Sequence, residues 1–203
     1  MMENRIKEIL TESGVLQSGH FVLTSGKHSE EYMQCAKVFQ YPHFTKELSE
    51  MIAAKFKNSE VDMVIGPAVG GIILSYQVAE SLGVMNVFAE REQGKMTLRR
   101  GFGIKEGQRI LVVEDVVTTG GSVKEVINLV KSRGAIVVGV ACLVDRSSNN
   151  KVFEEELYGL YHVNITTYES DSCPLCVKGL PITKPGSRNL VEKESYYERN
   201  RKF

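Results

Sequence analysis

The fold is decided by one stretch of the chain, RILVVEDVVTTGGS at residues 109–122. Its first half is an apolar run rich in β-branched residues, which is typical of a buried parallel strand and too short for a helix. Two adjacent acids, Glu114 and Asp115, end this run, and a loop of Thr, Gly and Ser follows. Ser122 and Glu125 have the spacing of a capping box, so a helix is predicted to begin at the loop.

The loop after the two acids is suited to an anion. Backbone N–H groups and a helix N-terminus gathered around one hollow are how proteins hold a phosphate. Acids at the carboxyl end of a parallel strand lie where open α/β sheets bind ligands. A phosphate cradle beside two carboxylates suits a phosphorylated sugar, because carboxylates accept hydrogen bonds from ribose hydroxyls. An ordinary strand–turn–helix corner would explain the glycines but not the paired acids.

Composition indicates an ordinary globular protein. The chain has 203 residues, 42% hydrophobic and 25% charged, which suits one domain with a small appendage and argues against disorder. Lys+Arg and Asp+Glu both number 25, so no overall charge would recruit nucleic acid or a membrane. The N-terminus has no apolar signal core, and no span approaches ~20 apolar residues. We therefore expect a soluble, cytoplasmic protein.

Strand-like and helix-like segments alternate along the chain, which predicts an α/β fold with a mostly parallel central sheet flanked by helices. We expect a main domain over residues 1–169 and an extension over 170–203, with a small hood made by the N-terminal and C-terminal segments. Residues 14–29 are turn-rich. The expected helices cover residues 4–13, 44–56 and 72–82, and the expected strands cover 61–65, 86–89, 135–144 and 163–168 besides the strand that begins at Arg109.

The cysteines and histidines give weak signals. Cys142 lies in a predicted strand and is interpreted as a core residue. Cys173 and Cys176 form one C-x-x-C pair without a second pair or a His at ligand spacing, so plain thiols are favoured over a shared metal site or a redox pair. We predict no metal ligands among the side chains, and surface or loop positions for all four histidines. These are His20, His28, His43 and His162.

Residues 110–122 resemble the signature of the type I phosphoribosyltransferases, enzymes that use 5-phosphoribosyl 1-diphosphate (PRPP). That signature has four apolar residues, two acids, two apolar residues and a Thr/Gly-rich loop, and this chain matches it throughout. The resemblance implies that the two acids hold the ribose 2- and 3-hydroxyls and that the loop holds the 5-phosphate. The PRPP-binding residues that it implies here are Glu114, Asp115, Val116, Val117, Thr118, Thr119, Gly120, Gly121 and Ser122.

A second glycine loop, GPAVGG at residues 66–71, follows a predicted strand. On its own it could be a tight turn. It is similar to the family loop that binds the pyrophosphate of PRPP through its backbone, which implies that Ala68, Val69 and Gly70 also bind PRPP. Orotate-specific members often carry a bulky residue and a Lys at this place. This chain has Val69 and Gly70 there, so no side-chain charge can be assigned to the loop.

Residues 90–101 are polar and basic, and such a segment could simply be a solvated hairpin. Cations beside a departing pyrophosphate would act mainly in the transition state. The segment resembles the basic loop that orotate-specific members close over the neighbouring subunit's active site, which implies a homodimer with shared sites. Arg91 and Lys95 correspond to catalytic cations of that loop, whereas Arg99 and Arg100 are candidates without a clear counterpart. The His and the acid–Gly run common in that loop are missing here.

The N-terminal segment, residues 14–35, contains GHFVLTSGKHS at 19–29. It resembles the segment that covers the base in orotate-specific members, which implies that Tyr32 and Met33 lie against orotate. Lys27 is a further candidate for binding orotate, because Thr24 stands where those members often have a Lys. The resemblance also assigns Thr118 and Arg146 to orotate, and a guanidinium suits a planar carboxylate. Without the family, Arg146 could be a surface residue at a strand end.

The function implied by the resemblance is transfer of the 5-phosphoribosyl group from PRPP to orotate, giving orotidine 5-monophosphate and pyrophosphate in pyrimidine biosynthesis. Mg2+ would bridge pyrophosphate and ribose oxygens as the cofactor. No residue has the pattern of a nucleophile, so positioning and charge stabilisation would carry the catalysis. Two alternatives stay open: a phosphoribosyltransferase for another base, and a PRPP-sensing regulator without catalysis. The neutral charge balance and the lack of an extra domain disfavour the regulator.

Overall fold

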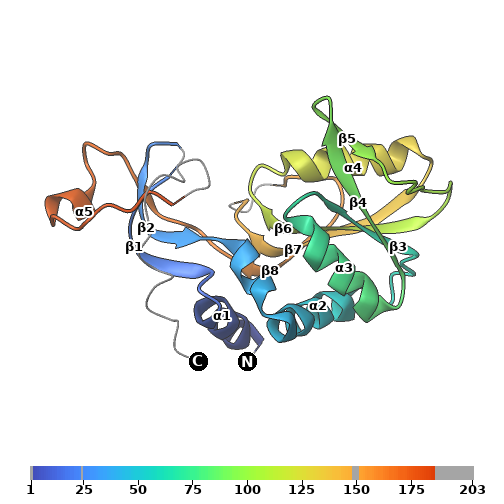
Figure 1. Ribbon diagram of the computed structural model, residues 1–203, viewed down its shortest axis with the longest axis horizontal. Helices are drawn as coiled ribbons and strands as arrows, with labels where there is room; N and C mark the ends of the chain where they lie inside the picture. Colours follow the sequence, from blue (N-terminus) through green and yellow to red (C-terminus); the bar gives the residue numbers. More distant parts are fainter. Residues whose placement is uncertain (1, 24, 148–150, 186–203) are drawn as a thin grey trace, which may run out of the picture. The chain divides into compact units, whose positions relative to one another are not determined.

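The computed structural model describes residues 2–23, 25–147 and 151–185 (Figure 1). They form two compact units, of which the first comprises Met1–Gln17 and Met33–Ile165. The second comprises Ser18–Tyr32 and the described residues from Thr166 onward. Each unit is thus built from segments that are distant in the sequence. None of the helices in these described ranges is long and apolar enough to cross a membrane.

The first unit is built on a six-stranded sheet with the order β5-β4-β3-β6-β7-β8. All neighbouring strands are parallel except β4 and β5, which form an antiparallel pair at one edge. This confirms the predicted α/β fold with a mostly parallel sheet. The strands are β3 (Met63–Pro67), β4 (Met85–Glu92), β5 (Lys95–Leu98), β6 (Arg109–Val117), β7 (Ile136–Asp145) and β8 (Leu157–His162).

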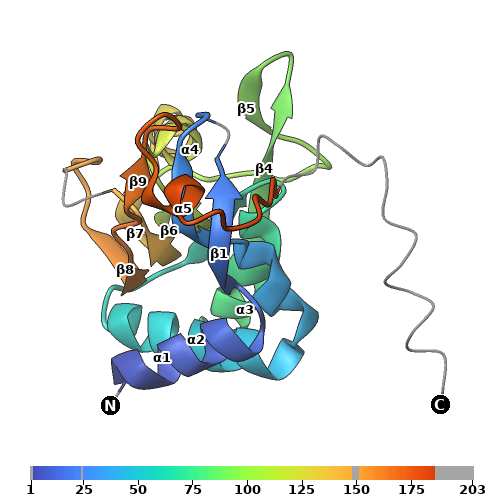
Figure 2. The ribbon, with the colours of Figure 1, turned by 90° about the vertical axis from the view of Figure 1, so that its left-hand side faces the viewer.

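Helices cover both faces of this sheet (Figures 1 and 2). Alternate residues of β6 point to opposite faces: Leu111 and Val113 pack with the first three helices, whereas Ile110 and Val112 pack with the fourth. Burial on both faces explains why this strand is a continuous apolar run. The helices are α1 (Met2–Glu12), α2 (Pro42–Phe56), α3 (Gly71–Leu82) and α4 (Gly121–Ser132), with a 3-10 turn η1 (Cys35–Gln40) before α2.

The small sheet of the molecule has the order β1-β2-β9. Its strands are β1 (Leu16–Val22), β2 (His28–Met33) and β9 (Thr167–Tyr168), and the helix α5 (Pro174–Val177) follows. Strands β2 and β9 are antiparallel, and the Thr183 N–H donates to the carbonyl of His20 at 2.7 Å. The described part of residues 170–203 therefore contributes to this second unit, and 186–203 lie outside the described residues.

Two local predictions were wrong. The last strand of the large sheet is Leu157–His162 rather than 163–168, and Thr167–Tyr168 belongs to the small sheet. The sequence pattern did not predict the strand Leu157–His162 because an acidic run precedes it and Gly159 interrupts it. Glycine is required at this position, since a Cβ there would lie 2.7 Å from the Cβ of Asp145. The turn-rich stretch 14–29 contains β1 and the start of β2, because main-chain pairing compensates for its weak strand propensity.

The histidine prediction was wrong for two of the four residues. His43 and His162 are exposed, as expected. His20 and His28 are only 3% and 6% exposed, and both lie in strands of the small sheet. Their burial follows from pairing with groups on α5, a segment about 150 positions away that no local pattern connects to them.

Candidate active site

The acid pair lies at the carboxyl end of β6, in the middle of the large sheet. Glu114 is 8% exposed; its Oε1 accepts a hydrogen bond from the Asp115 N–H at 3.0 Å. Asp115 Oδ1 accepts one from the Val116 N–H at 2.8 Å. Burial raises the pKa of both carboxyl groups, and the charge of Asp115 raises the pKa of Glu114 further.

No Lys, Arg or His among the described residues forms an ion pair with Glu114 or Asp115. Two adjacent, largely buried acids without a cation partner are costly in the free protein. A ligand that donates hydrogen bonds to them would offset that cost. The arrangement therefore suits the hydroxyl groups of a sugar.

The signature loop connects β6 to α4 and leaves the start of the helix open. Thr118, Thr119 and Gly121 are exposed, and no side chain caps the helix. The N–H groups of the first helical turn are thus available to an anion. Gly120 adopts φ 71°, and a Cβ there would lie 2.5 Å from Val152 Cγ1, so both backbone conformation and space require glycine.

The predicted capping box was wrong. The helix begins at Gly121, one residue before the expected cap, and Ser122 makes no capping hydrogen bond. Glu125 is instead held by Arg91, whose Nη2 lies 2.7 Å from Glu125 Oε1. A long-range ion pair has taken the carboxylate that the local pattern assigned to the helix start, which leaves the helix N-terminus open.

The second glycine loop, residues 66–71 between β3 and α3, packs directly against the acid pair. A Cβ added at Gly70 would lie 2.8 Å from Asp115 Oδ1, and one at Gly71 would lie 3.1 Å from Glu114 Oε1. Any side chain at Gly70 would displace the Asp115 carboxylate. The structure thus brings both predicted glycine loops to one place, with Val69 83% exposed beside them.

The basic segment is a hairpin made by β4 and β5 (Figure 1). Arg91 donates to Glu125 and to the carbonyl of Gly94, so its guanidinium is already engaged. Arg99 pairs with Glu92 at 3.4 Å and Arg100 with Glu90 at 2.8 Å. Of the four predicted cations, only Lys95 has no ion pair within the described ranges, so it is the cation left for a ligand.

The residues predicted to bind the base divide between the two compact units. Thr118 and Arg146 belong to the first, where the Arg146 N–H donates to the carbonyl of Val117 at 2.8 Å. This bond places both residues at the end of the sheet that carries the acid pair. Met33 also belongs to the first unit, with its side chain buried in the hydrophobic core.

Lys27 and Tyr32 belong to the second unit. Lys27 Nζ pairs with Glu169 Oε1 at 2.6 Å, and the ring of Tyr32 packs on that of Phe21, with 5.6 Å between the centroids. The ammonium of Lys27 is therefore already neutralised by a local acid. Phe153 was not anticipated from the sequence; its ring lies where a side chain at Gly120 would be.

A family model described as "Phosphoribosyl transferase domain" matches residues 35–169, which include both glycine loops and the acid pair. The chain belongs to this family. Among its relatives, the orotate phosphoribosyltransferase of Thermoanaerobacter sp. (strain X514) is 56% identical over 190 residues, covering 94% of this chain and 100% of that protein. The orotate phosphoribosyltransferase of Thermotoga maritima is 51% identical over 185 residues, covering 91% and 99%.

Solved structures of the family share this fold. The crystal structure of orotate phosphoribosyltransferase from Aeropyrum pernix matches with a TM-score of 0.66 and 24% identity, covering 78% of this chain and 93% of that one. An adenine phosphoribosyltransferase from Thermoanaerobacter pseudethanolicus matches with a TM-score of 0.59 and 20% identity, covering 66% and 88%. Structural likeness at this level is shared by members with different bases, so it supports the fold and not the choice of base.

Proposed function

We propose that this chain transfers the 5-phosphoribosyl group of PRPP to orotate, releasing pyrophosphate and forming orotidine 5-monophosphate. The observation that carries the proposal is the meeting of three features at the end of β6: the buried Glu114 and half-buried Asp115 without a cation partner among the described residues, an uncapped helix N-terminus, and a glycine loop packed on the acids. The identity of about half of all residues with orotate phosphoribosyltransferases supports orotate as the base.

Each part of the site has a role in this reaction. The backbone of residues 118–122 holds the 5-phosphate at the start of α4, and Glu114 and Asp115 accept hydrogen bonds from the ribose hydroxyls. The backbone of residues 68–70 holds the pyrophosphate. Arg146 pairs with the carboxylate of orotate.

The chemistry requires no protein nucleophile. The bond between ribose C1 and the pyrophosphate oxygen breaks, and its electron pair leaves with pyrophosphate. A ring nitrogen of the already anionic orotate supplies the pair for the new bond to C1. Lys95 stabilises the charge that grows on the departing pyrophosphate, so its contribution is larger in the transition state than in the ground state.

Mg2+ fits the donors at this site. A hard cation binds phosphate and carboxylate oxygens, and the two acids at the end of β6 have no other cation partner among the described residues. When bound with PRPP, Mg2+ would neutralise part of the pyrophosphate charge. Glu114 and Asp115 orient the ribose hydroxyls, and the two glycine loops leave room for the backbone to approach the phosphates.

We further propose that the active protein is a homodimer in which Lys95 reaches the partner's site. Val69, Ile73 and Tyr76 follow one another at helical spacing and are 83%, 49% and 64% exposed. Such an apolar surface beside the pyrophosphate loop suits contact with a second copy. Sedimentation of the wild type as a dimer and of Tyr76→Glu as a monomer would support this, with Ile136→Glu as an exposed apolar control in β7; a monomeric wild type would refute it.

The proposed function is tested by a base-selection assay. Consumption of orotate with PRPP and Mg2+ would be followed beside adenine, hypoxanthine and uracil, with pyrophosphate release as a second readout. The proposal predicts that, of the four bases, only orotate is turned over. Turnover with a purine would assign the chain to another base, and PRPP binding without turnover of any base would favour a regulator.

A further inference from the structure

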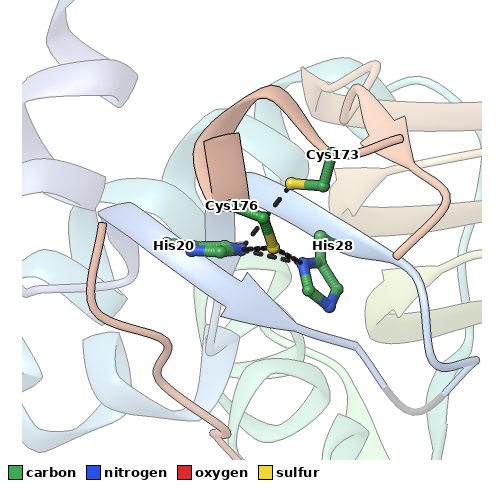
Figure 3. A group of neighbouring side chains, drawn as sticks. All are labelled: His20, His28, Cys173 and Cys176. Carbon is green, nitrogen blue, oxygen red and sulfur yellow. Dashed lines mark hydrogen bonds between the residues drawn. The ribbon is translucent and has the colours of Figure 1, made fainter. Parts of the chain in front are cut away.

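Four potential metal ligands meet in the second unit (Figure 3). They are His20 on β1, His28 at the start of β2, Cys173 just before α5 and Cys176 within α5. One ligand atom from each lies within 4.8 Å of the other three. None of the four belongs to residues 35–169, the part matched by the family model, and none has a role in the proposed transfer reaction.

The distances within this cluster are close to those around a tetrahedral metal ion. Zinc bonds of about 2.3 Å to sulfur and about 2.0–2.1 Å to nitrogen put neighbouring ligand atoms about 3.3–3.8 Å apart. The His20 Nε2 atom lies 3.7 Å from Cys173 Sγ and 3.8 Å from Cys176 Sγ. Cys176 Sγ lies 3.3 Å from His28 Nδ1. The two nitrogens, 2.8 Å apart, would have to separate slightly, and the wider spacings, up to 4.8 Å within the cluster, would have to close.

The hydrogen bond on the far side of His20 prepares it to bind a metal. Its Nδ1 lies 2.9 Å from the carbonyl oxygen of Leu180, which can only accept, so Nδ1 carries the proton. Nε2 then presents its lone pair to the cluster. A backbone carbonyl on the other ring nitrogen is the usual arrangement for a metal-binding histidine, because it fixes both the tautomer and the ring orientation.

The second unit has little else to stabilise it. Its described residues, 18–23, 25–32 and 166–185, contribute nothing to the two hydrophobic clusters of the molecule. Phe21 and Leu175 are its buried large apolar side chains, whereas three of the four cluster residues are also buried. A small unit with so little apolar core usually requires a disulfide, a metal or a partner. The two histidines beside the thiols favour the metal over a disulfide.

We propose that His20, His28, Cys173 and Cys176 bind one zinc ion as a structural site that joins the β1–β2 hairpin to α5. Four protein ligands close the coordination sphere and leave no position for a substrate, which is characteristic of structural rather than catalytic zinc. Binding converts both thiols to thiolates, and the proton that His28 Nδ1 shares with His20 Nε2 in the metal-free cluster moves to the other His28 nitrogen. Two protons per zinc are released to solvent.

The test measures metal in the untagged full-length chain. We expect about one zinc per chain by elemental analysis, retained through dialysis against a weak chelator. Cys176→Ser and His28→Gln should each lose at least nine-tenths of it. The matched controls are Cys142→Ala, a buried cysteine in β7, and His43→Gln, an exposed histidine; both should retain the full amount.

A cobalt spectrum keeps the proposal testable if a variant does not fold. Wild-type chain exchanged into Co2+ should show a thiolate-to-metal charge-transfer band and the intense visible bands of tetrahedral cobalt, removed by one equivalent of zinc. Zinc content unchanged in both ligand variants, or a wild type that contains no zinc and gives no such cobalt spectrum, would overturn the site. A Cys173–Cys176 disulfide in the freshly purified protein, detected by mass, would also overturn it.

Discussion

The acid pair with its glycine loops and the His/Cys cluster are two sites of opposite construction. The first is formed by two local motifs, because a parallel strand buried on both faces must be apolar and its ligand-binding residues follow at its carboxyl end. The second is assembled from three segments, with His20 and Cys176 separated by 156 positions. A site at the end of one strand can be predicted from its motif, whereas a site between distant segments becomes visible only in the fold.

The largest effect is expected for the hairpin cation. Lys95→Ala should lower kcat by roughly 10²–10³-fold with little change in the KM for PRPP, because the lost charge acts mainly on the departing pyrophosphate. Steady-state kinetics measure this, with Lys105→Ala, a charge change in an exposed turn, as the control. Arg91→Ala should have the smaller effect, because Glu125 already engages that guanidinium.

Mixing two inactive variants tests whether Lys95 acts across the dimer. If it does, Lys95→Ala and Asp115→Asn subunits that exchange should restore activity, since each mixed dimer contains one intact site. At equal amounts roughly a quarter of the wild-type sites should return. Confirmed exchange without recovery would place Lys95 in its own chain's site or outside catalysis.

A smaller and more selective effect is expected at the base. Arg146→Ala should raise the KM for orotate by roughly 10–150-fold, the equivalent of about 1.5–3 kcal/mol for a hydrogen bond to a charged group. The KM for PRPP should change far less. The reverse pattern would mean that Arg146 serves PRPP, and the assignment to orotate would be wrong.

The two sites should also be separable. Cys176→Ser should lose zinc and lower the melting temperature of the chain, because the second unit has little apolar core of its own. Its affinity for PRPP should stay within a few-fold of wild type, measured by titration calorimetry below the melting temperature. Loss of PRPP binding in a folded Cys176→Ser protein would show that the two sites depend on each other.

The smallest expected effect is on how the free energy of unfolding depends on pH. Burial and the neighbouring Asp115 raise the pKa of Glu114 to about 8 from its ordinary value near 4.5. The folded state therefore binds more protons than the unfolded state between these values, so the free energy of unfolding should fall as pH rises through this window. Urea denaturation of Glu114→Gln should show a weaker fall than the wild type. An equal pH dependence in both proteins would exclude Glu114 as its cause.

Sequence analysis could predict the elements whose patterns are local. The strand that begins at Arg109, the helix that ends at Leu82 and the convergence of two glycine loops all follow from burial and from the rule that parallel strands present ligands at their carboxyl ends. The capping box failed because Arg91, 34 positions away, takes Glu125. The edge strand that contains Gly159 was not predicted because its alternation of apolar and polar residues is weak.

The metal cluster could not be predicted for a different physical reason. His20 and His28 are separated by a hairpin turn, and Cys173 and Cys176 lie in a four-residue helix that packs near them only in the folded chain. Ligand spacing along one element, the usual signal for zinc, is absent for the histidines. The useful signal was the lone C-x-x-C pair, since such a pair can bind a metal only if the fold supplies two further ligands.

The central claim is that the acid pair at the end of β6 holds the ribose of PRPP. Titration calorimetry of PRPP with Mg2+ into Asp115→Asn tests it most directly, beside the wild type and the exposed control Glu106→Gln. We predict that Asp115→Asn weakens PRPP binding by about 1.5–3 kcal/mol, the cost of a charge-assisted hydrogen bond. Glu106→Gln should bind PRPP as tightly as the wild type, and the zinc content of both variants should equal that of the wild type. Unchanged PRPP affinity in a folded Asp115→Asn protein would contradict the account.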